Sequence, residues 1–272
     1  MNQRWNRRRD SYRPPAEPID PSRYGVALVE RDREARAFVE AHHYAASYPA
    51  ARARVGLYRM RGPTLSELVG VAVFSVPMSN AVVPKWMPGL DGDAGVELGR
   101  LVLLDDVEGN GESWFLARAF RLLRGELPGV RGVVSFSDPM QRKTEAGHLV
   151  MPGHVGTVYQ ALNGRHVGRT RPRWLHLDRA GRVVSDRALS KIRNDERGAA
   201  YAYRDLLASG APLRQPFEEG AAYVARALAE GPFRRVRHPG NFAYTWPLGE
   251  TTAAPLKALP FPKVATDIQP AA

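Results

Sequence analysis

The sequence predicts an α/β (α+β) protein with a mixed, partly parallel central sheet flanked by helices, followed by a helical and basic C-terminal extension. Two observations lead to this fold class. Segments with strand-like and helix-like apolar spacing alternate along the first two thirds of the 272 residues. In addition, two strongly apolar strands, 95–106 and 129–138, flank one helix in the sequence, as expected for neighbouring parallel strands with both faces covered.

The first part of the predicted domain has the order strand, helix, strand, strand. A short strand at 26–30 precedes a helix at 33–47, whose apolar residues recur at helical spacing. The segments 53–60 and 67–77 predict a hairpin, because the residues between them favour a turn. The next segment, 80–93, is expected to be a loop because it is rich in Pro, Gly and Asp.

The second part continues with strand, helix, strand, helix and two closing strands. A Gly-Asn-Gly turn leads from the first of these strands into an amphipathic helix with a continuous apolar stripe. The predicted elements are strand 95–106, helix 113–127, strand 129–138, helix 154–163 and closing strands within 165–178 and 182–186.

The remaining segments divide the chain into four expected regions. The two ends are poor in core-forming residues, and two helices at 189–210 and 216–231 precede a basic segment with alternating aromatics at 233–248. We therefore expect a flexible basic arm at 1–22, a catalytic domain at 23–186, a helical pair and basic aromatic segment packed on the core at 187–250, and a loose tail at 251–272.

Composition indicates a polyanionic partner. Lys and Arg number 39 against 28 Asp and Glu, so the net charge is +11. Such an excess favours binding to nucleic acid phosphates, although surface arginines that only contact solvent are the alternative. The absence of cysteine excludes disulfides, thiolate nucleophiles and Cys-ligated zinc. The sequence contains no apolar run long enough to span a membrane and no secretory signal, so we expect no membrane partner and a cytoplasmic protein.

The order of elements resembles the GNAT acyltransferase fold, in which the fourth and fifth strands splay apart to admit a pantetheine arm. In that family a Gly-rich turn before a helix binds diphosphate through backbone amides. The corresponding stretch here runs from Leu98 to Ser113, and its cofactor-binding candidates are Leu101, Val102, Asn110, Gly111, Glu112 and Ser113. The resemblance implies acyl-CoA, acetyl-CoA first, or another activated acyl donor. Glu108 and Glu112 depart from the family pattern, because they bring carboxylates to the expected phosphates.

Five blocks in order also resemble the bacteriophage Mom family, a divergent GNAT branch. The blocks are HHYAASYPAARARVGLYR, VELGRLVLLDD, SFSDP, PGHVGTVYQALNGRHVGRT and RHPGNFAYTWPL, and together they span residues 42–248. This resemblance implies an enzyme that converts adenine in phage DNA to a carbamoylmethyl form at N6 and so blocks host restriction enzymes. It also implies double-stranded DNA as the partner, and the host cytoplasm as the location if the gene belongs to a phage or prophage.

Four residues in the matched blocks are candidate catalytic residues. His43 and Tyr44 follow the first predicted helix, where a histidine can act as base or metal ligand, or simply suit a helix end. Asp138 follows an apolar strand and would orient the adenine amine or accept its proton, unless it only begins a turn with Pro139. Tyr159 matches the GNAT tyrosine that protonates the leaving thiolate; the alternative is a buried, hydrogen-bonded aromatic.

Other candidates would bind substrate or a metal. The substrate or DNA-binding candidates are Arg100, Ser135, His154, Asn163, Arg234, Arg235, Arg237 and Tyr244. The alternatives are a strand residue in solvent for Arg100, a turn residue for Asn163 and a charged edge strand for the basic segment. Iron or another metal is a further hypothesis, with His43, Tyr44, Asp138 and Tyr159 as candidate ligands.

Two other functions fit the same sequence. One is a conventional GNAT acetyltransferase acting on a protein or a small amine, and the other is a non-catalytic GNAT scaffold that coats DNA. Fold alone cannot separate these functions. The joint presence of His43, Asp138 and Tyr159 argues against the non-catalytic scaffold, and the two carboxylates of the phosphate loop argue against a conventional acetyl-CoA enzyme. The sequence does not determine the oligomeric state.

Overall fold

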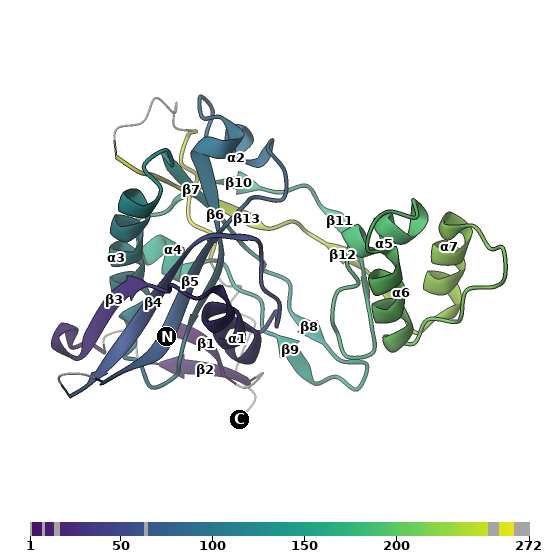
Figure 1. Cartoon of the computed structure of the whole chain (residues 1–272), viewed down its shortest axis with the longest axis horizontal. Helices are drawn as coiled ribbons and strands as arrows, with labels where there is room; N and C mark the ends of the chain where they lie inside the picture. Colours follow the sequence, from purple (N-terminus) through teal and green to yellow (C-terminus); the bar gives the residue numbers. More distant parts are fainter. Residues whose placement is uncertain (1, 7–8, 14–16, 63–64, 250–255, 264–272) are drawn as a thin grey trace. The chain divides into compact units, whose positions relative to one another are not determined.

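The computed structural model describes residues 2–6, 9–13, 17–62, 65–249 and 256–263 (Figure 1). The chain divides into two compact units, which are described separately below. Unit 1 contains Met1–Pro139, Gly153–Thr170 and Asn241–Ala272, and unit 2 contains Met140–Pro152 and Arg171–Gly240. This division differs from the expected boundary at residue 186, because segments from before and after that boundary join in each unit.

Unit 1 is built on a seven-stranded sheet with the order β10-β13-β7-β6-β5-β4-β3. The pair β6 and β7 is parallel, and the other neighbours are antiparallel. The strands are β3 (Tyr24–Leu28), β4 (Ala51–Arg61), β5 (Leu65–Ser75), β6 (Gly95–Leu103), β7 (Gly132–Ser137), β10 (Arg165–Arg169) and β13 (Phe242–Pro247). The predicted mixed, partly parallel sheet is therefore confirmed.

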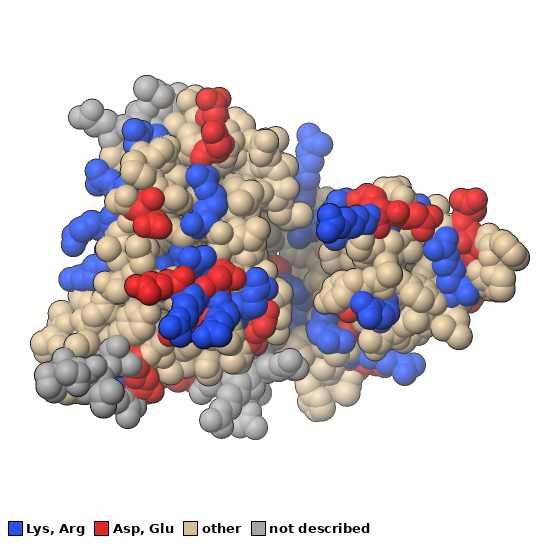
Figure 2. All heavy atoms as spheres, in the orientation of Figure 1, with Lys and Arg blue, Asp and Glu red and all other residues tan. Residues whose placement is uncertain are grey.

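Helices cover both faces of this sheet because β5 alternates its side chains between them. Val71 and Val73 pack with helix α1 (Asp32–His42). Ala72 and Phe74 point to the other face and join the main core with helix α3 (Gly111–Glu126). The buried apolar side chains of α3 are Phe115, Leu116, Ala119, Phe120 and Leu123, whereas Arg121 and Arg124 are exposed. Figure 2 shows basic side chains along the outer edge of α3.

The parallel strands β6 and β7 separate after a short ladder. Their pairing joins Gly95–Glu97 to Gly132–Val134 and ends there. At the next position the Ser135 hydroxyl donates to the carbonyl oxygen of Leu98, 2.9 Å away. Beyond it β6 continues to Leu103 and β7 to Ser137 without mutual pairing. This is the splay that the GNAT-like fold predicts, and it places polar residues of both strands at one open end.

Unit 2 combines two small β-ribbons with three helices. The ribbons pair β8 (Arg142–Lys143) with β9 (Leu149–Met151) and β11 (Arg173–Leu177) with β12 (Arg234–His238). The helices are α5 (Asp186–Arg193), α6 (Ala199–Ala208) and α7 (Gly220–Glu230). They share a separate apolar core that includes Ile192, Leu206 and Tyr223.

Three local predictions were wrong. The expected closing strand at 182–186 contains only an isolated bridge between Val183 and Leu177, and α5 begins at Asp186. The expected loop at 80–93 contains helix α2 (Val82–Trp86) and the 3-10 turn η2 (Gly92–Ala94), because Val83 and Trp86 are buried within it. The expected single helix at 189–210 is divided between α5 and α6. The break falls at Asp195 and Gly198, which adopt positive φ angles of 46° and 91°.

The two ends of the chain contain more structure than their composition indicates. Within the expected arm, β1 (Asn2–Asn6) pairs with β2 (Arg9–Arg13), and η1 (Pro21–Arg23) leads into β3. Within the expected tail, residues 256–263 belong to unit 1, where the Leu259 amide donates to the carbonyl oxygen of His166 at 2.8 Å. The rest of that tail lies outside the described residues. Among the helices that the structure describes, none is long and apolar enough to cross a membrane.

Candidate active site

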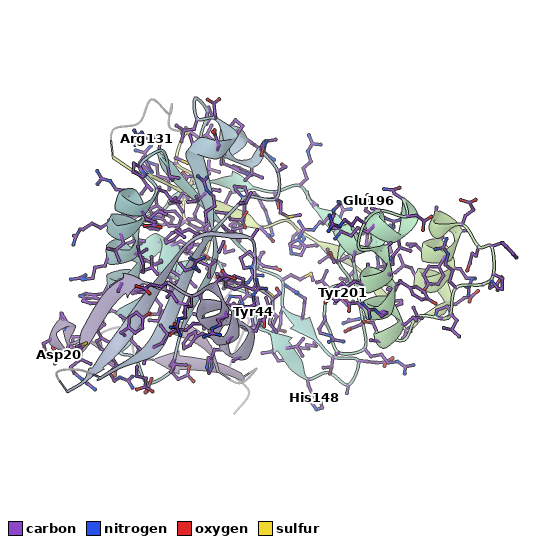
Figure 3. The ribbon with its side chains drawn as sticks, in the orientation of Figure 1. Asp20, Tyr44, Arg131, His148, Glu196 and Tyr201 are labelled. Atoms are coloured by element: carbon purple, nitrogen blue, oxygen red, sulfur yellow. The ribbon has the colours of Figure 1, made fainter. Side chains whose placement is uncertain are left out.

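The open end of β6 and β7 collects polar and aromatic side chains from four segments of unit 1. The ring centroids of His43 and Tyr44 are 4.2 Å apart, and those of Tyr44 and His154 are 6.5 Å apart. Tyr159 continues this series, with its ring 6.2 Å from His154. Figure 3 labels Tyr44 just beyond the end of α1. The structure therefore brings together residues that are more than 100 positions apart in sequence.

Tyr159 is the buried phenol of this group. It lies on the short helix α4 (Thr157–Ala161) and is 8% exposed. Burial raises the pKa of Tyr159, while a hydrogen bond with Ser135 lowers it in part. The phenol is therefore protonated at neutral pH. Its ring packs at 5.4 Å from Tyr244 and 5.6 Å from Trp246, so its position is fixed by the core.

Both histidines of the site are neutral at physiological pH. Burial lowers the pKa of His43 from 6.5 to about 3, and repulsion by the charge of Arg100 and by His154 when it is protonated adds to this shift. Burial also lowers the pKa of His154 to about 4, although Asp138 opposes this shift. The Nδ1 atom of His43 accepts a hydrogen bond from the Ala45 amide at 3.1 Å. The neutral ring of His43 therefore carries its proton on Nε2, which makes that atom a hydrogen-bond donor.

Arg100 supplies the positive charge of the site. Its Nε and Nη2 donate to the carbonyl oxygen and hydroxyl of Ser47 at 2.9 and 2.8 Å, and its Nη1 donates to the Gly99 carbonyl oxygen. Burial lowers the pKa of Arg100, but a guanidinium stays charged at neutral pH. These three bonds use three of its five N–H groups, and the other two have no acceptor among the described residues. They can receive an anionic group of a substrate.

Glu97 is a site residue that the sequence interpretation missed. It lies three residues before Arg100 on β6, and burial raises its pKa while the Arg100 charge opposes that rise. Its carboxylate also contributes to the raised pKa of Tyr159, so the two groups are electrostatic neighbours. The sequence does contain a signal for Glu97, because it is a single carboxylate within an apolar strand. Burying a carboxylate without a charged or hydrogen-bonding partner costs free energy, so such a residue points to a partner at that position.

Asp138 follows β7 directly and anchors the loop that carries His154. Its carbonyl oxygen accepts a hydrogen bond from the His154 amide at 2.7 Å. Its side chain raises the pKa of His154. The neighbouring Ser137 hydroxyl is buried and has no hydrogen-bond partner among the described residues. The predicted residues His43, Tyr44, Arg100, Ser135, Asp138, His154 and Tyr159 thus lie in one region.

A metal ion is not specified by these residues. Within the described parts of the chain, no three His, Asp or Glu side chains are grouped to hold a metal. The Nδ1 atom of His43 is engaged with Ala45, which leaves Nε2 as its possible ligand atom. A site that relies on Tyr44 and Tyr159 therefore stays a hypothesis, and no step of the proposal below uses it.

The expected cofactor loop differs from a diphosphate site. Leu101 and Val102 pair with β5 through their backbones, and Gly111 and Glu112 are buried at the start of α3. The amide of Gly109, just before these residues, donates to the Glu17 carboxylate at 2.9 Å. The Asn110 side chain accepts from the Ile19 amide at 2.7 Å, and the Ser113 hydroxyl donates to the Asn110 carbonyl oxygen. These residues do not fit the diphosphate of coenzyme A.

The other predicted binding residues lie elsewhere. Tyr244 is fully buried, and its hydroxyl donates to the Val155 carbonyl oxygen, so its placement in the core is incompatible with stacking on DNA. Asn163 has a φ of 55° at the end of α4, which is the geometry of a turn residue. Arg234, Arg235 and Arg237 lie in unit 2 on β12.

The chain is similar to one protein family and to a solved structure. The model of the Mom protein family matches residues 23–212. No curated protein matches the chain. Among solved structures, a "Tandem GNAT protein from the clavulanic acid biosynthesis pathway (without AcCoA)" aligns with 84% of this chain and 99% of its own chain, at 10% identity and a TM-score of 0.42.

Proposed function

Because the chain belongs to the Mom protein family, we propose that it is a transferase that attaches a carbamoylmethyl group to adenine N6 in phage DNA and so protects that DNA from restriction. The observation that carries the proposal is the cluster at the open end of β6 and β7. There a buried neutral phenol, a guanidinium and two carboxylates meet, and these supply a proton donor, an anion-binding group and a proton acceptor.

The proposed reaction forms a bond between adenine N6 and the methylene carbon of a carbamoylmethyl donor. The bond between that carbon and its leaving group breaks, and the electron pair departs with the leaving group. Asp138 orients the N6 amine and accepts its proton. Tyr159 delivers a proton to the leaving group, and Arg100 stabilises the negative charge that develops there. The transfer is redox-neutral and needs no further reactant.

Adenine must leave the DNA helix before it can react, because N6 is engaged in the Watson–Crick pair. This flipping costs a few kcal/mol, which the site must offset through stacking and hydrogen bonds to the base. The rings of His43 and Tyr44 lie 4.2 Å apart and are only partly buried. We propose that they form the stacking surface, with the Nε2–H group of His43 as a donor to the base.

The β11–β12 ribbon of unit 2 is the proposed contact with the DNA backbone. Trp174 on β11 is 46% exposed. The guanidinium carbons of Arg235 and Arg237 lie 4.2 and 5.4 Å from the centre of its ring. A ribbon that combines cations with an exposed aromatic plane suits phosphate contacts and stacking on bases.

Two alternatives make different demands on the same residues. A conventional acetyltransferase would need a diphosphate site, which the Glu17 contact to Gly109 disfavours. A non-catalytic scaffold would have no use for a buried tyrosine and a guanidinium with two N–H groups directed to no described acceptor. The proposed enzyme requires both features.

Nucleoside mass spectrometry of plasmid DNA from cells expressing the protein tests the proposal. The wild type should give a deoxyadenosine adduct, and Asp138→Ala and Tyr159→Phe should each reduce it about a hundredfold to ten-thousandfold, as for loss of a general acid or base. Tyr201→Phe, at a residue 64% exposed on α6, is the matched control and should keep the wild-type level.

DNA binding by the two site variants should stay at the wild-type level, because Asp138 and Tyr159 belong to unit 1, whereas the ribbon proposed to bind the DNA backbone belongs to unit 2. Unchanged adduct in both variants would contradict the site assignment. No adduct from the wild type in several hosts would contradict the enzyme proposal and favour the scaffold that coats DNA.

A further inference from the structure

In the loop between β6 and α3, the backbone amide that could bind an anion is hydrogen-bonded to a carboxylate of the same chain. A free amide at a glycine-rich turn before a helix is the group that binds a phosphate oxygen, because the amide and the helix dipole both favour negative charge. Here the Gly109 amide donates to an oxygen of the Glu17 carboxylate at 2.9 Å. A carboxylate is an anion with the same acceptor chemistry as a phosphate oxygen.

The segment that carries Glu17 is fixed to the same loop by further contacts. The Ile19 amide donates to the Asn110 side chain at 2.7 Å, and the Ile19 side chain is 8% exposed within the main core. Arg23 and Tyr24 hold the other side of the loop, at 3.2 and 2.8 Å from the Glu108 carboxylate. Asp20, labelled in Figure 3, bonds within its own turn to Ser22. The carboxylate of Glu17 is therefore delivered by an anchored segment.

The charge of the loop also opposes a diphosphate. Glu108 has 13% of its side chain exposed, and Glu112 is 6% exposed in the first turn of α3. With Glu17 these make three carboxylates around one turn, and residues 104–113 contain no Lys or Arg. Placing further negative charge beside them is unfavourable, because like charges in a partly buried site repel strongly.

We propose that the Glu17 carboxylate occupies the place where a GNAT-like fold would bind the diphosphate of coenzyme A. The carbamoylmethyl donor is then a small molecule that is not attached to coenzyme A or to another nucleotide diphosphate. This inference rests on the proposed function and names the class of its donor. The chemistry agrees: a thioester activates its carbonyl carbon, whereas the proposed transfer breaks a bond to a methylene carbon. The donor enters at the splay of β6 and β7, and the negative charge that develops on its leaving group lies toward the two N–H groups of Arg100 that have no acceptor among the described residues, before Tyr159 protonates that group.

A cell-free assay separates the donor class from the function itself. The full-length protein is incubated with adenine-containing duplex DNA and the small-molecule fraction of the expression host. One half of that fraction is first treated with a nucleotide diphosphatase until coenzyme A is absent by mass spectrometry. We expect equal adduct from both halves. Loss of adduct after treatment would overturn the inference, whereas no adduct from the untreated half would overturn the proposed function.

Binding measurements test the role of Glu17. By calorimetry, the wild type should not bind acetyl-CoA, and Glu17→Ala should bind inorganic diphosphate about tenfold or more tightly than the wild type, because a like charge has been removed. Asp20→Ala removes an equal charge from the same segment without freeing the Gly109 amide and should behave as the wild type. Acetyl-CoA binding by the wild type, or equal diphosphate binding by the wild type and Glu17→Ala, would overturn the inference.

Discussion

Glu97 shows how one side chain sets the electrostatics of the site. Its carboxylate lies on an apolar strand, and burial raises its pKa against the opposing charge of Arg100. Burial raises the pKa of Tyr159, and the same carboxylate adds to that rise. Glu97 therefore loses its proton at a higher pH than an exposed glutamate does, and once ionised it is a negative charge that interacts with both Arg100 and Tyr159.

The pH dependence of the reaction should report this ionisation. In the wild type, activity should rise with pH as Glu97 loses its proton, since the site needs the carboxylate to hold Arg100 and Tyr159 in their working states. Glu97→Gln should lower kcat/KM about a hundredfold and remove the rise of activity with pH on the acidic side of the profile. Glu34→Gln, on the exposed face of α1, is the control. A wild-type profile in Glu97→Gln would show that the carboxylate has no part in the reaction.

The two histidines of the site should make the fold sensitive to acid. Their pKa values fall from 6.5 in the unfolded chain to about 3 for His43 and about 4 for His154. Below pH 6.5 the unfolded state therefore binds more protons than the folded state, and the free energy of unfolding decreases as the pH falls toward 4. Each proton taken up contributes a slope of about 1.4 kcal/mol per pH unit.

Urea unfolding between neutral pH and pH 4 measures this slope. The double variant His43→Gln, His154→Gln should show a flatter dependence than the wild type. A His148→Gln variant controls for the loss of a histidine that is exposed and lies in unit 2. If the free energy of unfolding depends on pH equally in the wild type and the double variant, the two imidazoles take up protons at the same pH in the folded and the unfolded state, which contradicts the prediction.

Helix α4 depends on a glycine that brings two aromatic rings together. Gly156 precedes the helix with a φ of 79°, and a Cβ atom there would lie 2.8 Å from the rings of both Tyr159 and Tyr244. Gly156→Ala should therefore lower the free energy of unfolding by about 1–3 kcal/mol and displace Tyr159. Gly147 has a similar φ of 86° with nothing within 4 Å, so Gly147→Ala isolates the backbone strain.

Chemical denaturation and the adduct assay check this pair of variants. Gly156→Ala should lose more stability than Gly147→Ala, and only Gly156→Ala should lose activity among folded molecules. Equal losses would mean that the close approach of the rings contributes nothing to the site.

Elements with local signals were predictable from the sequence, and those formed by distant contacts were not. The apolar stripes of α1 and α3 and the β4–β5 hairpin follow from spacing within each segment. The insertion of β13 between β7 and β10 joins strands more than 70 residues apart, which no local pattern specifies. The basic segment at 233–248 is divided at Gly240, whose φ is 96°, so that β12 and β13 belong to different units.

The residues of the candidate site also differ in how far the sequence predicted them. His43, Asp138 and Tyr159 were predicted because they match blocks of the family, and their individual chemistry left alternatives open. Glu97 was missed because a single charge does not alter the apolar pattern of β6. Glu17 was missed because its segment has the composition of a flexible arm, whereas its carboxylate is placed by a contact across 92 residues.

The charge of the whole molecule makes its affinity for DNA depend on salt. The net charge is +11, so binding should release counterions from the phosphates that the protein neutralises. If about five phosphates are neutralised, the logarithm of affinity should fall with the logarithm of salt concentration at a slope near −4.5. A flat response would contradict DNA binding through the backbone.

The contribution of the ribbon can be separated from net charge by a matched pair of triple variants. Arg234→Ala, Arg235→Ala and Arg237→Ala together remove three cations from the ribbon around Trp174 and should reduce the slope to about −1.8, since each lost phosphate contact removes about 0.9. Arg118→Ala, Arg121→Ala and Arg124→Ala remove three cations from α3 and should leave the slope near the wild-type value. Fluorescence anisotropy with a labelled duplex at several salt concentrations gives both slopes. A reduced slope in the α3 variant, with a wild-type slope in the ribbon variant, would show that the DNA backbone binds to the exposed face of α3 and not to the ribbon of unit 2.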